Sequence, residues 1–136
     1  DFKFSTHAFL AKEKSQQLFP DCKISVVKEI INTGGKLNGI TMEDVGQGYL
    51  TPDQWHEAMH SQKDEKDTVL IDCRNHKEYS IGRFEGAVDP NTRTFSEFFD
   101  WVKSKESNGI FSDKKVFMYC TGGIRCEKAS AFVRQN

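Results

Sequence analysis

The residue type best suited to chemistry in this chain is a cysteine, Cys120, placed at a junction of three local patterns. The apolar run Lys115 to Tyr119 predicts a buried strand, and the residues around Ala129 and Phe132 predict a helix. The two glycines between them permit a tight turn that aims backbone N–H groups at one point. That point is also a helix N-terminus, which favours an anion. A sulfur held there should have a lowered pKa and react as a thiolate, so we predict that Cys120 is the catalytic nucleophile.

The five residues after the cysteine are predicted to bind the substrate. Their backbone N–H groups would cradle the charged sulfur, and an arginine adds a fixed positive charge at the rim. An arginine in the first turn of a helix opposes the helix dipole, which favours a functional role over a solvated one. The alternative is a small buried cysteine at a strand end, but the surrounding pattern favours the nucleophile. The predicted binding residues are Thr121, Gly122, Gly123, Ile124 and Arg125.

Four further residues are predicted to support this loop. Asp72 and Arg74 follow a predicted strand, so they should meet Cys120 at the carboxyl edge of a parallel sheet. With Glu78 they are expected to form an ion-pair and capping network, although direct substrate contact is the alternative. Cys126 is either a thiol that resolves an oxidised Cys120 or, slightly favoured, a small residue packed under the helix start.

Two sequence blocks resemble the rhodanese-like domain family. One is Cys-Thr-Gly-Gly-Ile-Arg-Cys-Glu-Lys-Ala-Ser at 120–130, and the other runs from Val-Leu-Ile-Asp-Cys-Arg-Asn at 69–75 to the Gly-Arg-Phe-Glu-Gly-Ala segment at 82–87. The match is similar in detail to the rhodanese domain of the tRNA uridine hydroxylase group and its eukaryotic relatives. It covers roughly residues 49–136. Most rhodaneses have a histidine where this chain has Arg83, and the hydroxylase group also departs there.

The resemblance implies an α/β fold, a parallel sheet with helices on both faces, and a sulfur-carrying loop cysteine. Its first implied function is a sulfurtransferase, in which Cys120 takes sulfur from a donor such as thiosulfate. The resulting persulfide is then passed to a thiol or cyanide-like acceptor. Four residues separate Cys120 from Arg125, a shorter loop than in phosphatases of related plan, which favours sulfur over phosphate.

The alternative functions are an oxygen-dependent tRNA wobble-uridine hydroxylase and a non-enzymatic module that senses redox or persulfide state. tRNA is implied as a partner by resemblance only, and neither a cofactor nor a metal is predicted.

Composition narrows the class of protein. The 136 residues carry a formal net charge of −1 and contain no long basic run, which argues against a strong autonomous nucleic-acid binder. No apolar run approaches the roughly 20 residues of a membrane helix, so no membrane partner is predicted. The four cysteines form no C-x-x-C pair, which favours free thiols in a reducing intracellular compartment, either the cytoplasm or an organelle interior.

The chain divides into three predicted regions. Residues 1–32, with a helix over 7–19 and a strand over 22–27, are expected to end a preceding α+β domain. The resemblance implies that this domain is ferredoxin-like. Residues 33–48 carry several glycine turn signals and are the expected linker, and residues 49–136 form an incomplete rhodanese-like domain.

Within the third region, strand and helix signals alternate, as in a parallel sheet covered on both faces. The signals are a helix start at Thr51-Pro52, a strand over 68–72, a cap at Asn75, a short strand at 87–88 and an aromatic helix face from Phe95. The resemblance implies a further internal strand and helix after residue 136. We therefore expect a sheet left open by these residues, either because the sequence is truncated or proteolysed or because another chain supplies the missing strand. A closed sheet would contradict this hypothesis.

Overall fold

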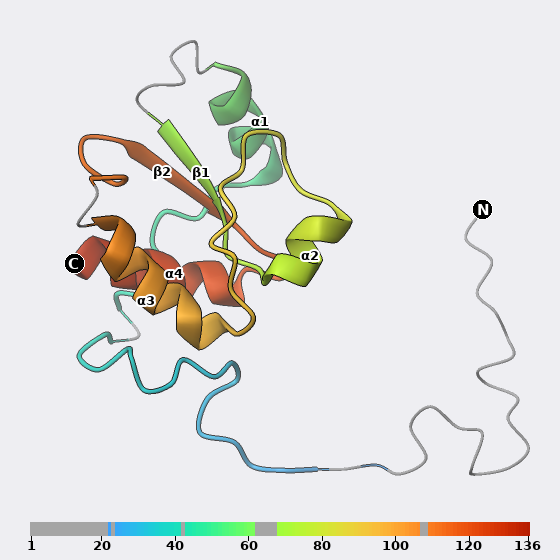
Figure 1. The fold of residues 1–136 in the computed structure, drawn as a ribbon, viewed down its shortest axis with the longest axis vertical. Helices are drawn as coiled ribbons and strands as arrows, with labels where there is room; N and C mark the ends of the chain where they lie inside the picture. The colour runs from blue at the N-terminus through green and yellow to red at the C-terminus, as the bar shows by residue number, and fades with distance from the viewer. Residues whose placement is uncertain (1–21, 23, 42, 62–67, 107–108) are drawn as a thin grey trace, which may run out of the picture.

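The computed structural model describes residues 22, 24–41, 43–61, 68–106 and 109–136. Helices and strands follow one another along the chain from residue 52 onward, and the strands lie together inside the helices (Figure 1). This is an α/β fold, as the alternating pattern predicts. The elements are α1 (Pro52–His60), β1 (Thr68–Asp72), α2 (His76–Ile81), α3 (Phe95–Glu106), β2 (Lys115–Tyr119) and α4 (Ile124–Gln135).

β1 and β2 form a two-stranded parallel sheet in which Val69 pairs with Val116 and Ile71 with Met118. The predicted short strand at 87–88 is reduced to one parallel bridge, between Val88 and Ile71. The Val88 N–H donates to the Leu70 carbonyl (2.8 Å), and the Val88 carbonyl accepts from the Asp72 N–H (3.1 Å). β1 therefore lies between this bridge and β2.

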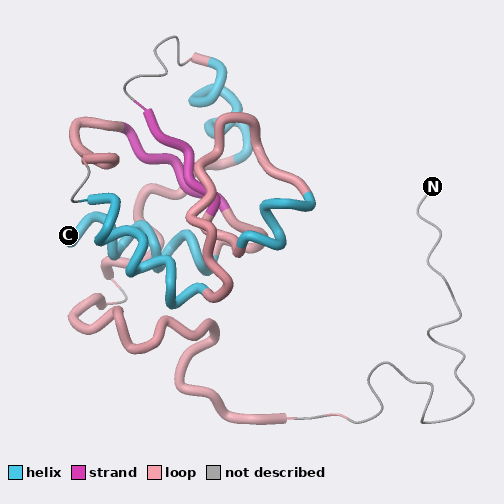
Figure 2. The backbone as a smooth tube through the Cα atoms, in the orientation of Figure 1, coloured by secondary structure: helices cyan, strands magenta, loops and turns pink. Residues whose placement is uncertain are grey.

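The pleat of the strands sends alternate side chains to two layers. On one face, Ile71 and Met118 pack with the aromatic side of α3 and with α4, and Ile71 is fully buried. On the other face, the Phe117 ring lies edge-on to Trp55 of α1, with ring centres 5.7 Å apart. Helices thus cover both faces of the sheet, which confirms the predicted arrangement (Figure 2).

The two predicted helix caps are present. The Thr51 side chain accepts from the Gln54 N–H, and the Gln54 side chain accepts from the Thr51 N–H, which together make a capping box with Pro52 in the first turn. Asn75 and Glu78 form the same reciprocal pair at the start of α2. The starts of these two helices are therefore set by local sequence.

The strand predicted over residues 22–27 is not formed. In the described part of this segment the backbone is irregular, and Ile24 and Val26 are 92% and 102% exposed. A strand needs a neighbour for its N–H and C=O groups, and no described strand lies beside this one. The helix predicted over 7–19 lies outside the described residues. The domain boundaries therefore stay a prediction.

The sheet is open along β2. Within the described residues β2 pairs with β1 alone, and a large cavity lies against Val116 to Tyr119 without touching any β1 residue. A closed sheet, which would have contradicted the expectation of an open one, is therefore not observed in the described residues. The source of a further strand stays a prediction.

Phe98 gives a test of this packing. It is fully buried and its ring contacts those of Phe95, Phe99 and Trp101. Replacing it by alanine should lower the free energy of unfolding by about 3–5 kcal/mol, because a large cavity opens in the core. Urea unfolding of Phe98→Ala against the parent protein measures this. Ile81→Ala, at a side chain that is 90% exposed, should change little; equal losses for the two variants would contradict the assignment of the core.

Candidate functional site

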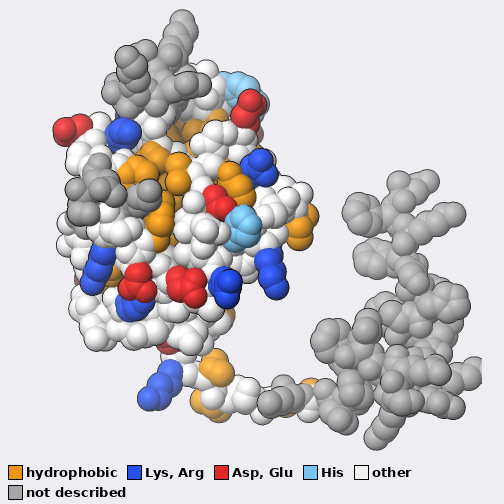
Figure 3. Space-filling view, in the orientation of Figure 1, with side chains coloured by type: hydrophobic (Ala, Val, Ile, Leu, Met, Phe, Trp, Pro, Cys, Tyr) orange, Lys and Arg blue, Asp and Glu red, His pale blue; other side chains and the backbone are white. Residues whose placement is uncertain are grey.

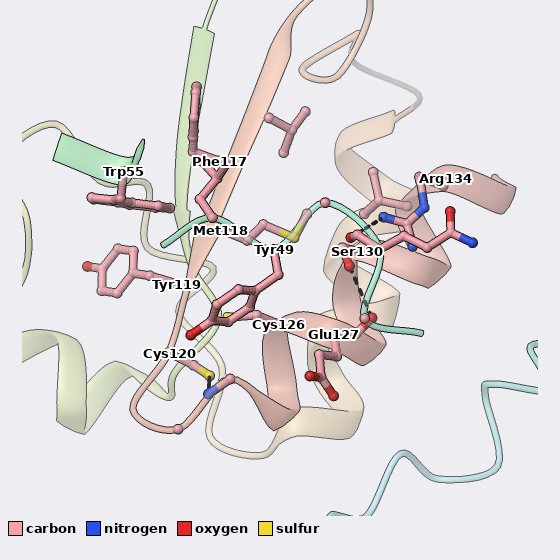
Figure 4. Close-up of a pocket in the computed structure, with 18 of the residues that line it drawn as sticks. Tyr49, Trp55, Phe117, Met118, Tyr119, Cys120, Cys126, Glu127, Ser130 and Arg134 are labelled. Atoms are coloured by element: carbon pink, nitrogen blue, oxygen red, sulfur yellow. Dashed lines mark hydrogen bonds between the residues drawn. The ribbon is translucent and has the colours of Figure 1, made fainter. Parts of the chain in front are cut away.

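Cys120 lies between the end of β2 and the start of α4, at the mouth of a tight turn (Figure 4). The turn closes because Gly123, the residue before α4, has a φ of 85°, a region that glycine enters without strain. The Gly123 N–H donates to the Cys120 sulfur at 3.1 Å. The backbone N–H groups of Gly122 and Cys126 also favour the charged form of this sulfur. Several N–H groups thus converge on one atom.

The expected lowering of the Cys120 pKa is wrong for this reduced structure. The pKa of Cys120 is raised, first because the Cys126 thiol contacts it and second because burial disfavours the thiolate. The N–H groups of Cys126 and Gly122 act in the opposite direction and do not prevail. The sequence pattern showed the N–H cradle but not the second thiol inside it.

Cys126 links Cys120 to a third cysteine. Its thiol contacts that of Cys120 on one side and that of Cys73 on the other. Contact with Cys120 favours ionisation of Cys126, but contact with Cys73 and burial raise its pKa. Cys73, at the end of β1, is only 2% exposed. The three sulfurs form a chain from the loop into the core.

Arg125 is held by a carboxylate. Its Nη1 donates to Glu78 Oε2 and its Nη2 to Glu78 Oε1, both at 2.7 Å, and its side chain is 16% exposed. The Glu78 contact raises the pKa of Arg125, and the nearby Cys120 sulfur raises it further. The guanidinium therefore lies between Glu78 and the loop sulfur, where sequence reasoning expected it to face an anionic substrate.

The remaining predicted binding residues lie at the rim of the turn. Thr121 and Gly122 are exposed, and Ile124 is 40% exposed. The Thr121 hydroxyl donates to Glu78 and accepts from Arg125, each at 3.3 Å. Thr121 therefore joins the ion pair, while Gly122 and Ile124 present free surface beside the sulfur. Substrate contact by these residues stays a prediction.

Glu78 serves two elements at once. It completes the cap of α2 by accepting from the Asn75 N–H (3.1 Å), and it holds Arg125 of α4. The Arg125 contact is the main reason why the pKa of Glu78 falls to about 2. The carboxylate thus remains charged and paired over the ordinary pH range.

A second ion pair lies beneath the site. Arg74 donates from Nη2 to Asp72 Oδ2 (2.7 Å) and from Nε to Asp72 Oδ1 (2.9 Å), and the Asp72 side chain is fully buried. Burial alone would raise the pKa of Asp72, but contacts from Arg74 and Tyr119 hold it below its usual value. Burial and the Asp72 contact raise the pKa of Tyr119 to about 12.

Sequence reasoning missed Tyr119, which reads as one more apolar strand residue. Its ring contacts Phe84 (4.8 Å between centres) and lies beneath the Arg74 guanidinium. The only available signal was its place directly before Cys120 at the end of a strand.

A cavity of about 800 Å³ opens beside Cys120. Figure 4 shows Trp55, Tyr49, Met118 and Ser130 around it, with Cys120 at one end. Its walls come from residues 46–50, from β2 and from α4. The loop sulfur therefore borders a mostly apolar space that also reaches solvent.

The described residues contain neither a candidate metal site nor a membrane-spanning helix. No group of three or more histidine, cysteine or acidic residues there could hold a metal ion. In the same part of the chain, no helix combines the length and apolar character needed to cross a membrane.

The family profile of the rhodanese-like domain matches residues 52–136, which include both β-strands and the whole cysteine loop. The chain belongs to the rhodanese-like domain family. The resemblance in the two sequence blocks, and the fold that it implies, are thereby confirmed.

Three curated relatives of this rhodanese-like chain carry the name tRNA uridine(34) hydroxylase. The relative from Brucella ovis is 44% identical over 121 residues, that from Rhizobium leguminosarum bv. trifolii 42% over 120, and that from Bartonella quintana 40% over 121. These matches cover 88–89% of this chain but only 36–38% of each relative. The chain thus spans little more than a third of the length of the relatives it matches.

These names overturn the first functional prediction. Sequence reasoning favoured a sulfurtransferase with a thiosulfate donor and a thiol or cyanide-like acceptor, whereas the relatives are named as hydroxylases of a tRNA uridine. The prediction relied on the shape of the loop, and a fold or a loop shape does not by itself specify the reaction. The hydroxylase alternative is the better supported one.

The Glu78–Arg125 pair makes stability depend on pH. The pKa of Glu78 is about 2 in the folded protein against a reference of 4.5, so its stabilising contribution is complete above about pH 5 and is lost as the pH falls toward 2. Urea unfolding of the parent protein and Glu78→Gln should therefore differ most near neutral pH and converge in acid. A difference that stays constant down to pH 2 would contradict this account.

The Cys126 thiol is expected to suppress ionisation of Cys120. Cys126→Ala removes the largest cause of the raised Cys120 pKa, so the midpoint of Cys120 alkylation by iodoacetamide should move to lower pH. Rates are measured by mass spectrometry of the Cys120 peptide. Cys22→Ala, at an exposed thiol, is the matched control and should leave the Cys120 profile unchanged. An unmoved midpoint in Cys126→Ala would show that the thiol contact does not set the pKa.

Proposed function

We propose that this chain forms the rhodanese-like part of an enzyme that hydroxylates uridine 34 of tRNA, and that the activity depends on Cys120. The observation that carries the proposal is the 40–44% identity to relatives of that name over nearly nine-tenths of the chain. Because the chain matches little more than a third of each relative, the activity is assigned to the whole gene product that contains it.

The geometry supports a central role for Cys120. Its sulfur accepts a hydrogen bond from the Gly123 N–H, lies against Arg125 and borders a cavity large enough for a planar base such as uracil. Gly122 and Ile124, exposed at the rim, are assigned to substrate contact. Arg125 is assigned to positioning, because both of its terminal nitrogens already bind Glu78.

The charge pattern of the surface supports a division of the tRNA contacts within the gene product. On the face shown in Figure 3, basic and acidic side chains are interspersed rather than gathered by sign. With a net charge of −1, the chain as a whole exerts little electrostatic attraction on a polyanion such as tRNA. We therefore assign to it the local contacts around the uridine, with most phosphate contacts made elsewhere in the gene product.

The test is the modification state of uridine 34. In cells whose own uridine-34 hydroxylase is deleted, the gene product containing this chain should restore one added oxygen on that nucleoside. Cys120→Ser should reduce the product to background, because a serine hydroxyl stays protonated and is far less nucleophilic than a thiolate. Nucleoside mass spectrometry of purified tRNA measures both.

Cys22→Ser is the matched control, since Cys22 is exposed and outside the site. Full activity of a folded Cys120→Ser protein would remove Cys120 from the mechanism. No added oxygen with the folded parent protein would refute the proposed function itself.

A further inference from the structure

Cys120 and Cys126 are arranged as a pair. Cys120 ends the β2 side of the turn, and Cys126 lies in the first turn of α4, so the tight Gly-Gly turn folds the chain back and brings the two thiols into contact. Both side chains are half-buried and both line the same cavity, at the same end of it (Figure 4). A small oxidant that enters the cavity therefore meets both sulfurs.

The third thiol is placed differently. Cys73 also contacts Cys126, but it is 2% exposed and does not line this cavity. Cys22 is exposed and lies in the irregular segment before the sheet, outside the cavity. Among the four cysteines, Cys120 and Cys126 are the two that combine mutual contact with access.

We propose that Cys120 and Cys126 form a reversible disulfide when the protein meets a hydroperoxide, with Cys126 as the resolving thiol. This goes beyond the proposed function and does not depend on it. The Cys120 sulfur attacks the peroxide, the O–O bond breaks, and Cys120 becomes a sulfenic acid while the peroxide leaves as an alcohol or water. The Cys126 sulfur then attacks the Cys120 sulfur, the S–O bond breaks, and water leaves with the Cys126 proton. Two thiols thus supply the two electrons that reduce one hydroperoxide, and an external dithiol reverses the change.

The surrounding groups favour the first step. The N–H groups of Gly122, Gly123 and Cys126 stabilise negative charge on the Cys120 sulfur as it reacts. The positive charge of Arg125 lies beside the same atom. Once the disulfide forms, Cys120 has no free thiol and cannot act as a nucleophile. The disulfide also protects Cys120 from irreversible oxidation to the sulfinic or sulfonic acid.

The sequence provides a direct readout. Trypsin cleaves after Lys115, Arg125 and Lys128, which places Cys120 in peptide 116–125 and Cys126 in peptide 126–128. After brief treatment of the whole protein with hydrogen peroxide, a non-reducing digest should contain these two peptides joined. The linked pair should disappear on treatment with dithiothreitol. The intact protein should lose the mass of two hydrogens and recover it.

Variants separate the roles. Cys126→Ser should abolish the linked pair and instead add oxygen to Cys120, with a sulfenic acid that a cyclic 1,3-dione traps. Cys22→Ser should leave the linked pair unchanged. Cys126→Ala, checked for folding by circular dichroism, is the second variant should serine disturb the core.

Three results would overturn the proposal. They are oxygen accumulating on Cys120 of the parent protein without a link to Cys126, a disulfide between Cys73 and Cys126, and links between chains only. The measurement on the parent protein needs no variant and no tRNA. Its failure is therefore distinguishable from failure of the hydroxylase proposal.

Discussion

The contact between Glu78 and Arg125 holds the site together. Glu78 is fixed by the cap of α2, and Arg125 is fixed by the first turn of α4, so one bidentate ion pair joins two segments 47 residues apart. Thr121 adds its hydroxyl to the same carboxylate. Because the pair is only partly exposed, it keeps its geometry and positions the turn against the end of the sheet. The Cys120 sulfur lies in this same turn, where it accepts the Gly123 N–H.

The sulfur itself is under two opposing influences. Backbone N–H groups and Arg125 favour a thiolate, whereas the Cys126 thiol and burial favour the protonated form. The second influence prevails in the reduced protein. Without the Cys126 contact, burial alone would oppose the N–H groups and Arg125. The Cys126 thiol and burial explain why a pattern typical of a low-pKa loop does not produce one here.

The comparison with relatives shows how far a fold constrains a reaction. A strand, a cysteine, two glycines and a helix start are enough to identify a rhodanese-like loop, and the family match over residues 52–136 agrees. A loop that suits sulfur transfer thus lies in a chain whose matched relatives are named as hydroxylases of tRNA uridine. N–H groups around a sulfur stabilise charge whichever atom the sulfur later attacks, so the loop alone does not select the chemistry.

The sequence by itself determined the local elements of this protein. These elements depend on neighbours in the chain, so periodicity and cap chemistry reveal them. They are both capping boxes, the order of strands and helices from residue 52, and the junction that presents Cys120.

Tertiary structure decided the rest. It placed Arg125 on Glu78, Cys126 between Cys120 and Cys73, and the Tyr119 hydroxyl beside Asp72. It also left residues 24–27 without a strand despite their alternating pattern. Contacts between distant segments set ion pairs, thiol neighbours and strand pairing, and a strand forms only where a partner accepts its hydrogen bonds.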